Sequence, residues 1–62
     1  MKPSIMVKLL SEGYAGEGVY KGDTGKILGD KGDGLYEVEF SDTYGYTIAI
    51  LVLPGKDFAA VK

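Results

Sequence analysis

Turn-forming residues interrupt this chain at short and regular intervals, and this pattern limits its fold more than any other feature. Glycine, proline, aspartate and serine mark turns at 12–13, 21–23, 30–34, 41–43 and 54–55. Short runs rich in Val, Ile, Tyr and Phe lie between them, at the spacing of about 8–12 residues seen in small β-sandwiches and barrels. With 62 residues the chain has room for one core, so the sequence predicts a single all-β domain, 1–62.

The apolar patterns predict five strands, at 5–10, 24–29, 35–40, 46–53 and 60–61. Alternation places Val7 and Leu9 on one face of the first strand. The third strand alternates most cleanly, with Tyr36, Val38 and Phe40 inward and Glu37 and Glu39 outward. We expect a hairpin turn at Asp33-Gly34 and one helical turn at 57–59 with Asp57 as N-cap. Five short strands with a long loop after the first, 11–23, predict a five-stranded SH3-like barrel.

The strand at 46–53 is apolar on both sides, unlike a half-buried strand at the edge of a sheet. Its two sides are Ile48, Ile50 and Val52 on one, and Ala49, Leu51 and Leu53 on the other. A barrel of this size buries one side only, so the other needs a second copy or a partner. We assign that role to Ala49, Leu51 and Leu53, and expect self-association as a homodimer.

Composition removes the common catalytic and metal-binding groups. The chain has no Cys and no His, so disulfides, the usual zinc sites, the commonest general base and the strongest nucleophile are missing. Glu37 and Glu39 share a strand face, but so short a chain cannot easily build the deep cleft of a glycosidase. Residues 22–26 fail the phosphate-loop spacing, and the acidic turn at 30–34 lacks EF-hand ligands. We expect no catalysis, cofactor, metal or small-molecule substrate.

Most of the chain resembles one family of small bacterial proteins, DUF4926. Residues 7–12, 17–25, 35–40 and 47–49 read VKLLSE, EGVYKGDTG, LYEVEF and TIA, similar to the family's EGV-K-GD-G-I, YEVEF and T-IA stretches. The chain departs from the pattern at 53–56, where LPGK replaces a more acidic tail. The resemblance implies an SH3-like β-barrel. It implies no activity, because the function of that family is unknown.

Tyrosines make protein binding the best-supported function. Tyr14 and Tyr20 lie in the 11–23 loop, and Tyr44 and Tyr46 lie around the fourth turn. Such amphipathic side chains are enriched at interfaces, and SH3 domains hold proline-rich peptides with a comparable loop and aromatic patch. The same tyrosines would also cover the ends of a small barrel that has no Trp.

The charge balance points away from nucleic acid. Seven lysines, no arginine and nine acidic residues give a net charge of −2, whereas nucleic-acid binding draws on cations. Residues 21–27 nevertheless resemble a KOW-type motif of ribosomal and transcription-factor barrels. A KOW-like RNA- or DNA-binding barrel, using Lys8, Lys21 and Lys26 beside Tyr20, is therefore the alternative.

An outward acidic face would instead attract a basic protein through charge complementarity. Its members are Glu37, Glu39, Asp30 and Asp33. No export signal is present, and the longest apolar run, 48–53, is far shorter than the roughly 20 residues that span a bilayer. We expect a non-catalytic protein-interaction module of the cytoplasm, without a membrane role, acting as an adaptor or as an antitoxin- or immunity-type protein.

Overall fold

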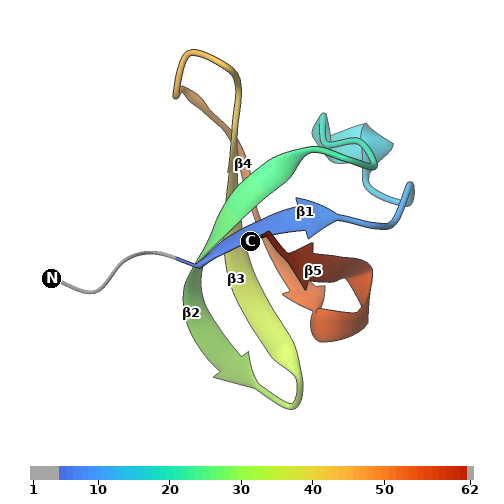
Figure 1. Ribbon diagram of the computed structural model, residues 1–62. Coiled ribbons are helices and arrows are strands. Elements are labelled where there is room, and N and C mark those ends of the chain that lie inside the picture. Colours follow the sequence, from blue (N-terminus) through green and yellow to red (C-terminus); the bar gives the residue numbers. More distant parts are fainter. Residues whose placement is uncertain (1–4, 62) are drawn as a thin grey trace, which may run out of the picture.

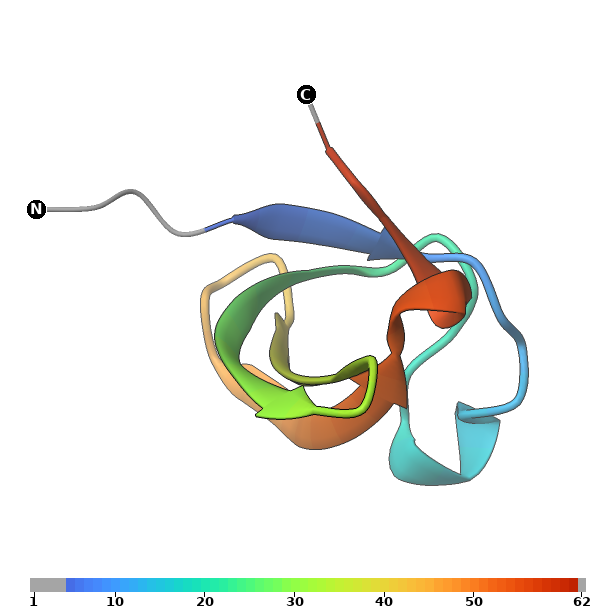
Figure 2. The same ribbon diagram turned by 90° about the horizontal axis from the view of Figure 1, so that it is seen from below.

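The computed structural model describes residues 5–61 and shows one antiparallel sheet that curls around a single core (Figures 1 and 2). Its strands are β1 (Met6–Leu9), β2 (Thr24–Gly32), β3 (Leu35–Ser41), β4 (Thr47–Pro54) and β5 (Phe58–Ala60), in the order β4-β3-β2-β1-β5. The predicted all-β fold of five strands is confirmed. Within residues 5–61, the outer strands β4 and β5 do not pair, so the barrel stays open there. Residues 1–4 and 62, the ends of the predicted domain, lie outside the described residues.

Six side chains are almost completely withdrawn from solvent and form the core. They are Val7 and Leu9 of β1, Val19 of the β1–β2 loop, Val38 and Phe40 of β3, and Leu53 of β4. The inward positions predicted for the first and third strands are therefore confirmed. Val19 was not predicted, because a single apolar residue among glycines has no alternation that shows which way it points. Each such burial contributes about 1.5–3 kcal/mol.

The β2–β3 hairpin turns at the predicted pair of residues. Asp33 has φ 57° and Gly34 has φ 76°, the positive values that a two-residue type I′ turn requires at both positions. β2 continues to Gly32 instead of ending at Gly29, and the ladder with β3 is irregular at two places, between Ile27 and Gly29 and between Asp30 and Gly32. Glycine here marks irregular pairing and not the end of the strand.

The chain end differs from the prediction. The expected helical turn at 57–59 with Asp57 as N-cap is wrong: a 3-10 turn, η2 (Gly55–Asp57), follows Pro54 directly. β5 then begins at Phe58, two residues before the predicted strand, and pairs with β1. The Asp57 carboxylate accepts a hydrogen bond from the Tyr14 hydroxyl, 43 residues away in sequence. Such a long-range contact has no local sequence signal.

Gly25 of β2 leaves no room for a side chain against β3 and gives the first testable prediction. A Cβ there would lie 2.7 Å from the Glu39 carbonyl oxygen and 3.0 Å from the Val38 and Phe40 side chains. Gly25→Ala should therefore destabilise the fold by about 1–3 kcal/mol through overpacking, as measured by urea unfolding. Gly29→Ala in the same strand is the control, since no heavy atom lies within 4 Å of that added Cβ. Equal stability of the two variants would contradict the prediction.

Candidate protein-binding surface

β4 does leave one apolar side uncovered, but the predicted assignment of its two sides is wrong. Leu53 is fully buried, and Ala49 and Leu51 pack against the core, whereas Ile50 and Val52 on the other side are 52% and 50% exposed. Ile48, 42% exposed, does not continue this side, because the ladder is irregular between Thr47 and Ala49 and the Ile48 side chain lies beside Gly18 of the β1–β2 loop. We call Ile50 and Val52 the outer stripe. Sequence reasoning missed these two residues as a candidate site.

The register of β4 against β3 explains the correction. Residues directly opposite each other on neighbouring strands share a face of the sheet. Leu51 lies opposite Val38, and Ala49 lies opposite Phe40, which are both buried. Each side of β4 is apolar on its own, so its sequence does not reveal which one faces the core. The alternation of the neighbouring strand, once the pairing is known, decides the matter.

The two glutamates beside the outer stripe are ion-paired. Glu39 lies opposite Ile50, and Glu37 lies opposite Val52. The Lys26 ammonium lies 3.5 Å from the Glu39 carboxylate, and the Lys31 ammonium lies 3.8 Å from that of Glu37. The predicted outward position of both glutamates is confirmed, but much of their charge is compensated. The outer stripe is therefore bordered by paired charges and not by a free acidic face.

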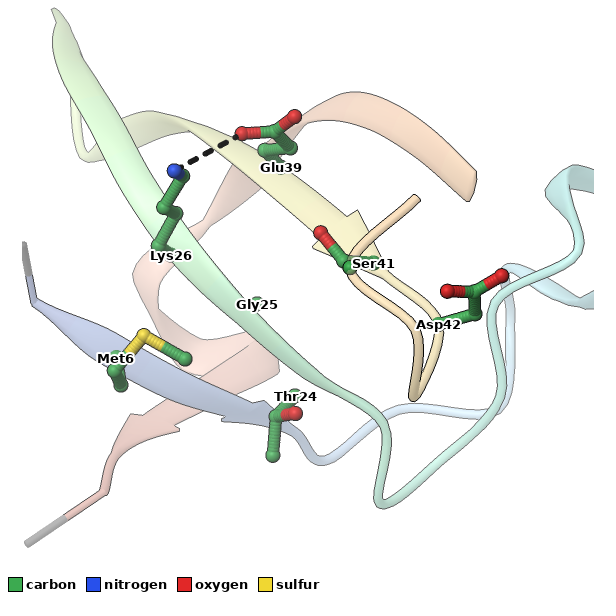
Figure 3. Close-up of a pocket in the computed structure, with 8 residues that line it drawn as sticks. Met6, Thr24, Gly25, Lys26, Glu39, Ser41 and Asp42 are labelled. Carbon is green, nitrogen blue, oxygen red and sulfur yellow. Dashed lines mark ion pairs between the residues drawn. The ribbon is translucent and has the colours of Figure 1, made fainter. Parts of the chain in front are cut away.

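A half-open depression of about 320 Å³ lies at the Lys26–Glu39 pair (Figure 3). Figure 3 shows the Lys26 and Glu39 side chains pointing toward each other, with Ser41 and Asp42 farther along the depression. Lys26 and Glu39 thus bind one another, while the Asp42 carboxylate binds the backbone of its own turn. Among residues 5–61 no cluster of three or more Asp, Glu, His or Cys side chains is placed to hold a metal ion.

The β3–β4 turn holds two tyrosines outward. One oxygen of the Asp42 carboxylate accepts hydrogen bonds from the backbone N–H groups of Tyr44 and Tyr46, at 2.9 and 3.0 Å. Gly45 supplies the positive φ, 88°, that the turn needs. Tyr44 and Tyr46 are consequently 85% and 74% exposed. Tyr46 directly precedes β4, so this turn extends the apolar surface beyond the start of the outer stripe.

Tyr14 and Tyr20 lie on a different segment. They belong to the β1–β2 loop, which contains the 3-10 turn η1 (Ala15–Glu17) and lies at the same end of the sheet as the β3–β4 turn (Figures 1 and 2). Tyr14 is half-buried and donates its hydroxyl to Asp57, at 2.5 Å, while Tyr20 is exposed. The structure therefore separates the four predicted tyrosines into two pairs. Tyr14 ties the loop to η2.

A family sequence model matches nearly all of the residues that form this fold. The sequence model described as "Domain of unknown function (DUF4926)" covers residues 6–60, from the first residue of β1 to the last of β5. The chain belongs to the DUF4926 family. No curated protein and no solved structure matches it. Among residues 5–61 of this DUF4926 protein, no helix has the length and apolar character needed to cross a membrane.

Neighbouring groups lower the pKa of the Glu39 carboxylate beside the outer stripe. A hydrogen bond from the Thr47 hydroxyl, followed by the positive charge of Lys26, lowers its pKa despite some opposing desolvation. Because the folded-state pKa lies below the unfolded one, this contribution to stability is complete above about 4.5 and is lost as the pH falls through the lowered value.

Thr47→Val tests this arrangement. Removing the hydroxyl should raise the Glu39 pKa in the folded DUF4926 domain, and Lys26→Met should raise it as well, as measured by NMR titration of the side-chain carboxyl carbon. Thr43→Val, in the adjacent turn, is the matched control and should leave this pKa unchanged. An unaltered titration of Glu39 in Thr47→Val would refute the assigned hydrogen bond.

Tyr14→Phe tests the tether between the loop and η2. The hydrogen bond to Asp57, burial and the negative charge of Asp57 together raise the pKa of Tyr14. Loss of the hydroxyl should reduce stability by about 1 kcal/mol at neutral pH, measured by urea unfolding. Tyr20→Phe is the control, because no hydrogen bond of that hydroxyl occurs among residues 5–61. Identical unfolding midpoints for the two variants would show that the tether contributes nothing.

Proposed function

We propose that this DUF4926 protein is a non-catalytic protein-interaction module of the bacterial cytoplasm, and that it binds its partner through the outer stripe and the adjoining β3–β4 turn. The observation that carries the proposal is the exposed pair Ile50 and Val52 on one face of β4, with Ile48 and Tyr46 also exposed near the start of the strand. Large aliphatic side chains that stay about half exposed next to one another favour contact with another protein over contact with water.

The arrangement around the outer stripe supports the same function. Protein interfaces combine an apolar centre, enriched in tyrosine and other aromatic residues, with a polar rim. Here Glu37 and Glu39 form one side of the rim, and their pairing with Lys31 and Lys26 lowers the cost of bringing an apolar partner close. The ion pair with Glu39 also competes for Lys26, one of the three cations on which the KOW-like alternative depends.

The finer version of this proposal is an antitoxin- or immunity-type partner of a basic protein. Its support is the net charge of −2 together with the turn residues Asp30 and Asp33, which form no ion pair among the described residues 5–61. Because lysines compensate Glu37 and Glu39, the negative charge that could attract a basic protein lies at the β2–β3 turn. Reversing Asp30 and Asp33 to lysine should therefore slow association at low salt. An unchanged association rate would exclude the electrostatic version and leave the apolar one standing.

Tyr46→Ala tests the binding surface. The tagged protein would be used to recover partners from the native cell with nuclease present, and the affinity of the recovered protein would then be measured by calorimetry. Tyr46→Ala should weaken binding by at least about tenfold, as truncation of a central aromatic residue does at interfaces. Tyr20→Ala, which removes an exposed tyrosine of the β1–β2 loop and not of the β3–β4 turn, should bind like the wild type.

Three outcomes would contradict this assignment. Loss of binding in Tyr20→Ala but not in Tyr46→Ala would move the site to the β1–β2 loop. Recovery that disappears with nuclease, and an affinity that falls steeply with salt, would favour the KOW-like alternative. Recovery of no protein in stoichiometric amount from the native cell would remove the support for a heterologous partner.

A further inference from the structure

β4 is the outermost strand of the sheet, and its free edge has no strand partner among residues 5–61. It is eight residues long and carries no charged side chain, whereas the opposite outer strand, β5, has only three residues. Proteins usually protect such edges with lysine, proline or bulges, because an exposed edge pairs with other chains. In β4 those devices occur only toward the ends. A β-bulge lies at Ile48, where Phe40 faces Ala49 and Ser41 faces Thr47, and Pro54 is the last residue.

The direction of the free backbone groups follows from the ladder with β3. The Gly55 N–H donates to the Gly34 carbonyl at 3.1 Å, one step beyond the pair Leu35–Pro54. Antiparallel ladders alternate between hydrogen-bonded and non-hydrogen-bonded pairs, and this register is unbroken from Pro54 to Ala49. Val52 and Ile50 therefore occupy non-hydrogen-bonded positions. Their N–H and C=O groups point away from β3, toward the free edge.

We propose that this edge pairs with β4 of a second copy, antiparallel and with Leu51 on the two-fold axis. The regular edge between the bulge and Pro54 is 49–53, and Leu51 is its midpoint. In this register Ile50 faces Val52 of the second copy, and Val52 faces its Ile50. Each of these pairs exchanges both N–H···O bonds, since all their groups point to the edge. No other centre within 49–53 uses every one of those free groups in a pair.

The side chains agree with this pairing. On the outer face Ile50 would lie beside Val52 of the second copy, and on the inner face Ala49 would lie beside its Leu53, so that every cross-strand pair is apolar. The charged groups on the adjacent strand are Glu37 and Glu39, which are paired with lysines of the same copy. The joined edges therefore bring no unpaired like charges together.

The expected interface is small. A standard interface buries about 800 Å² on each partner, close to a fifth of the 4417 Å² surface of this chain, and one strand edge covers less than that. We therefore expect a reversible dimer with a dissociation constant in the micromolar range, and not a permanent one.

The pairing extends the proposed function without depending on it. It would place the outer stripes of two copies side by side on one continuous sheet, doubling the apolar surface offered to a partner. Tyr46 lies outside the paired segment 49–53, so loss of partner binding in Tyr46→Ala and loss of the dimer are separate observations.

Sedimentation velocity over a concentration series tests the proposal on the full chain. The mass should rise from 6.6 kDa toward twice that value as the concentration increases. Val52→Pro should abolish the rise, because it removes a donor that serves only the free edge and is tolerated where the N–H faces solvent. Leu28→Lys, which removes an exposed aliphatic side chain of β2, is the matched control and should dimerise like the wild type.

Amide hydrogen exchange in the wild type gives a readout that does not depend on any variant. The Ile50 and Val52 amides should exchange slowly in concentrated solution and at least about tenfold faster on dilution, whereas the Leu51 amide, bonded to β3, should change little. A monomer at every concentration up to the millimolar range would overturn the proposal. So would a dimer that persists in folded Val52→Pro, or Ile50 and Val52 amides whose exchange ignores dilution.

Discussion

The structure depends on the burial of one small set of apolar side chains against the concave face of a single sheet. Val38 and Phe40 of β3 belong to it, together with residues of β1, β4 and the β1–β2 loop. Since a chain of this length exposes a large fraction of its surface even when folded, the sheet cannot cover both faces of every strand. β4 shows this limit, because it is apolar on both sides and only one of them is buried. The outer stripe is thus a consequence of the size of the domain as much as of its sequence.

Without disulfides or metals, the long β1–β2 loop is held by contacts that are distant in sequence. Val19 inserts into the core, Tyr14 donates to the Asp57 carboxylate, and the Leu10 N–H donates to the Asp57 carbonyl at 2.8 Å. Asp57 of η2 therefore holds the loop through both its side chain and its backbone carbonyl. This explains how a glycine-rich segment keeps a defined course, and why Tyr14 serves the fold while Tyr44 and Tyr46 are free to face solvent.

The fold could be predicted where the information is local. Alternation in β3 and the Asp33-Gly34 turn are properties of neighbouring residues, and both were predicted correctly. The side of β4 that faces solvent was not, because that depends on which β3 residues lie opposite. The role of Asp57 was also missed, since its partner lies 43 residues away. Ion pairing of Glu37 and Glu39 needed the β2 register, which the sequence left open because β2 is irregular at its glycines.

The ion pairs of Glu37 and Glu39 weaken an electrostatic role for this surface and favour an apolar one. A free carboxylate beside Ile50 or Val52 would have to be desolvated whenever a partner covered the outer stripe, at a cost that a nearby lysine partly offsets. Lys26 and Lys31 provide that offset from β2, on the side of β3 away from the stripe. The charges can therefore stay in place while the stripe and the free edge beside it are covered. For so small a domain, the surface left over by the core is then the place at which we propose recognition.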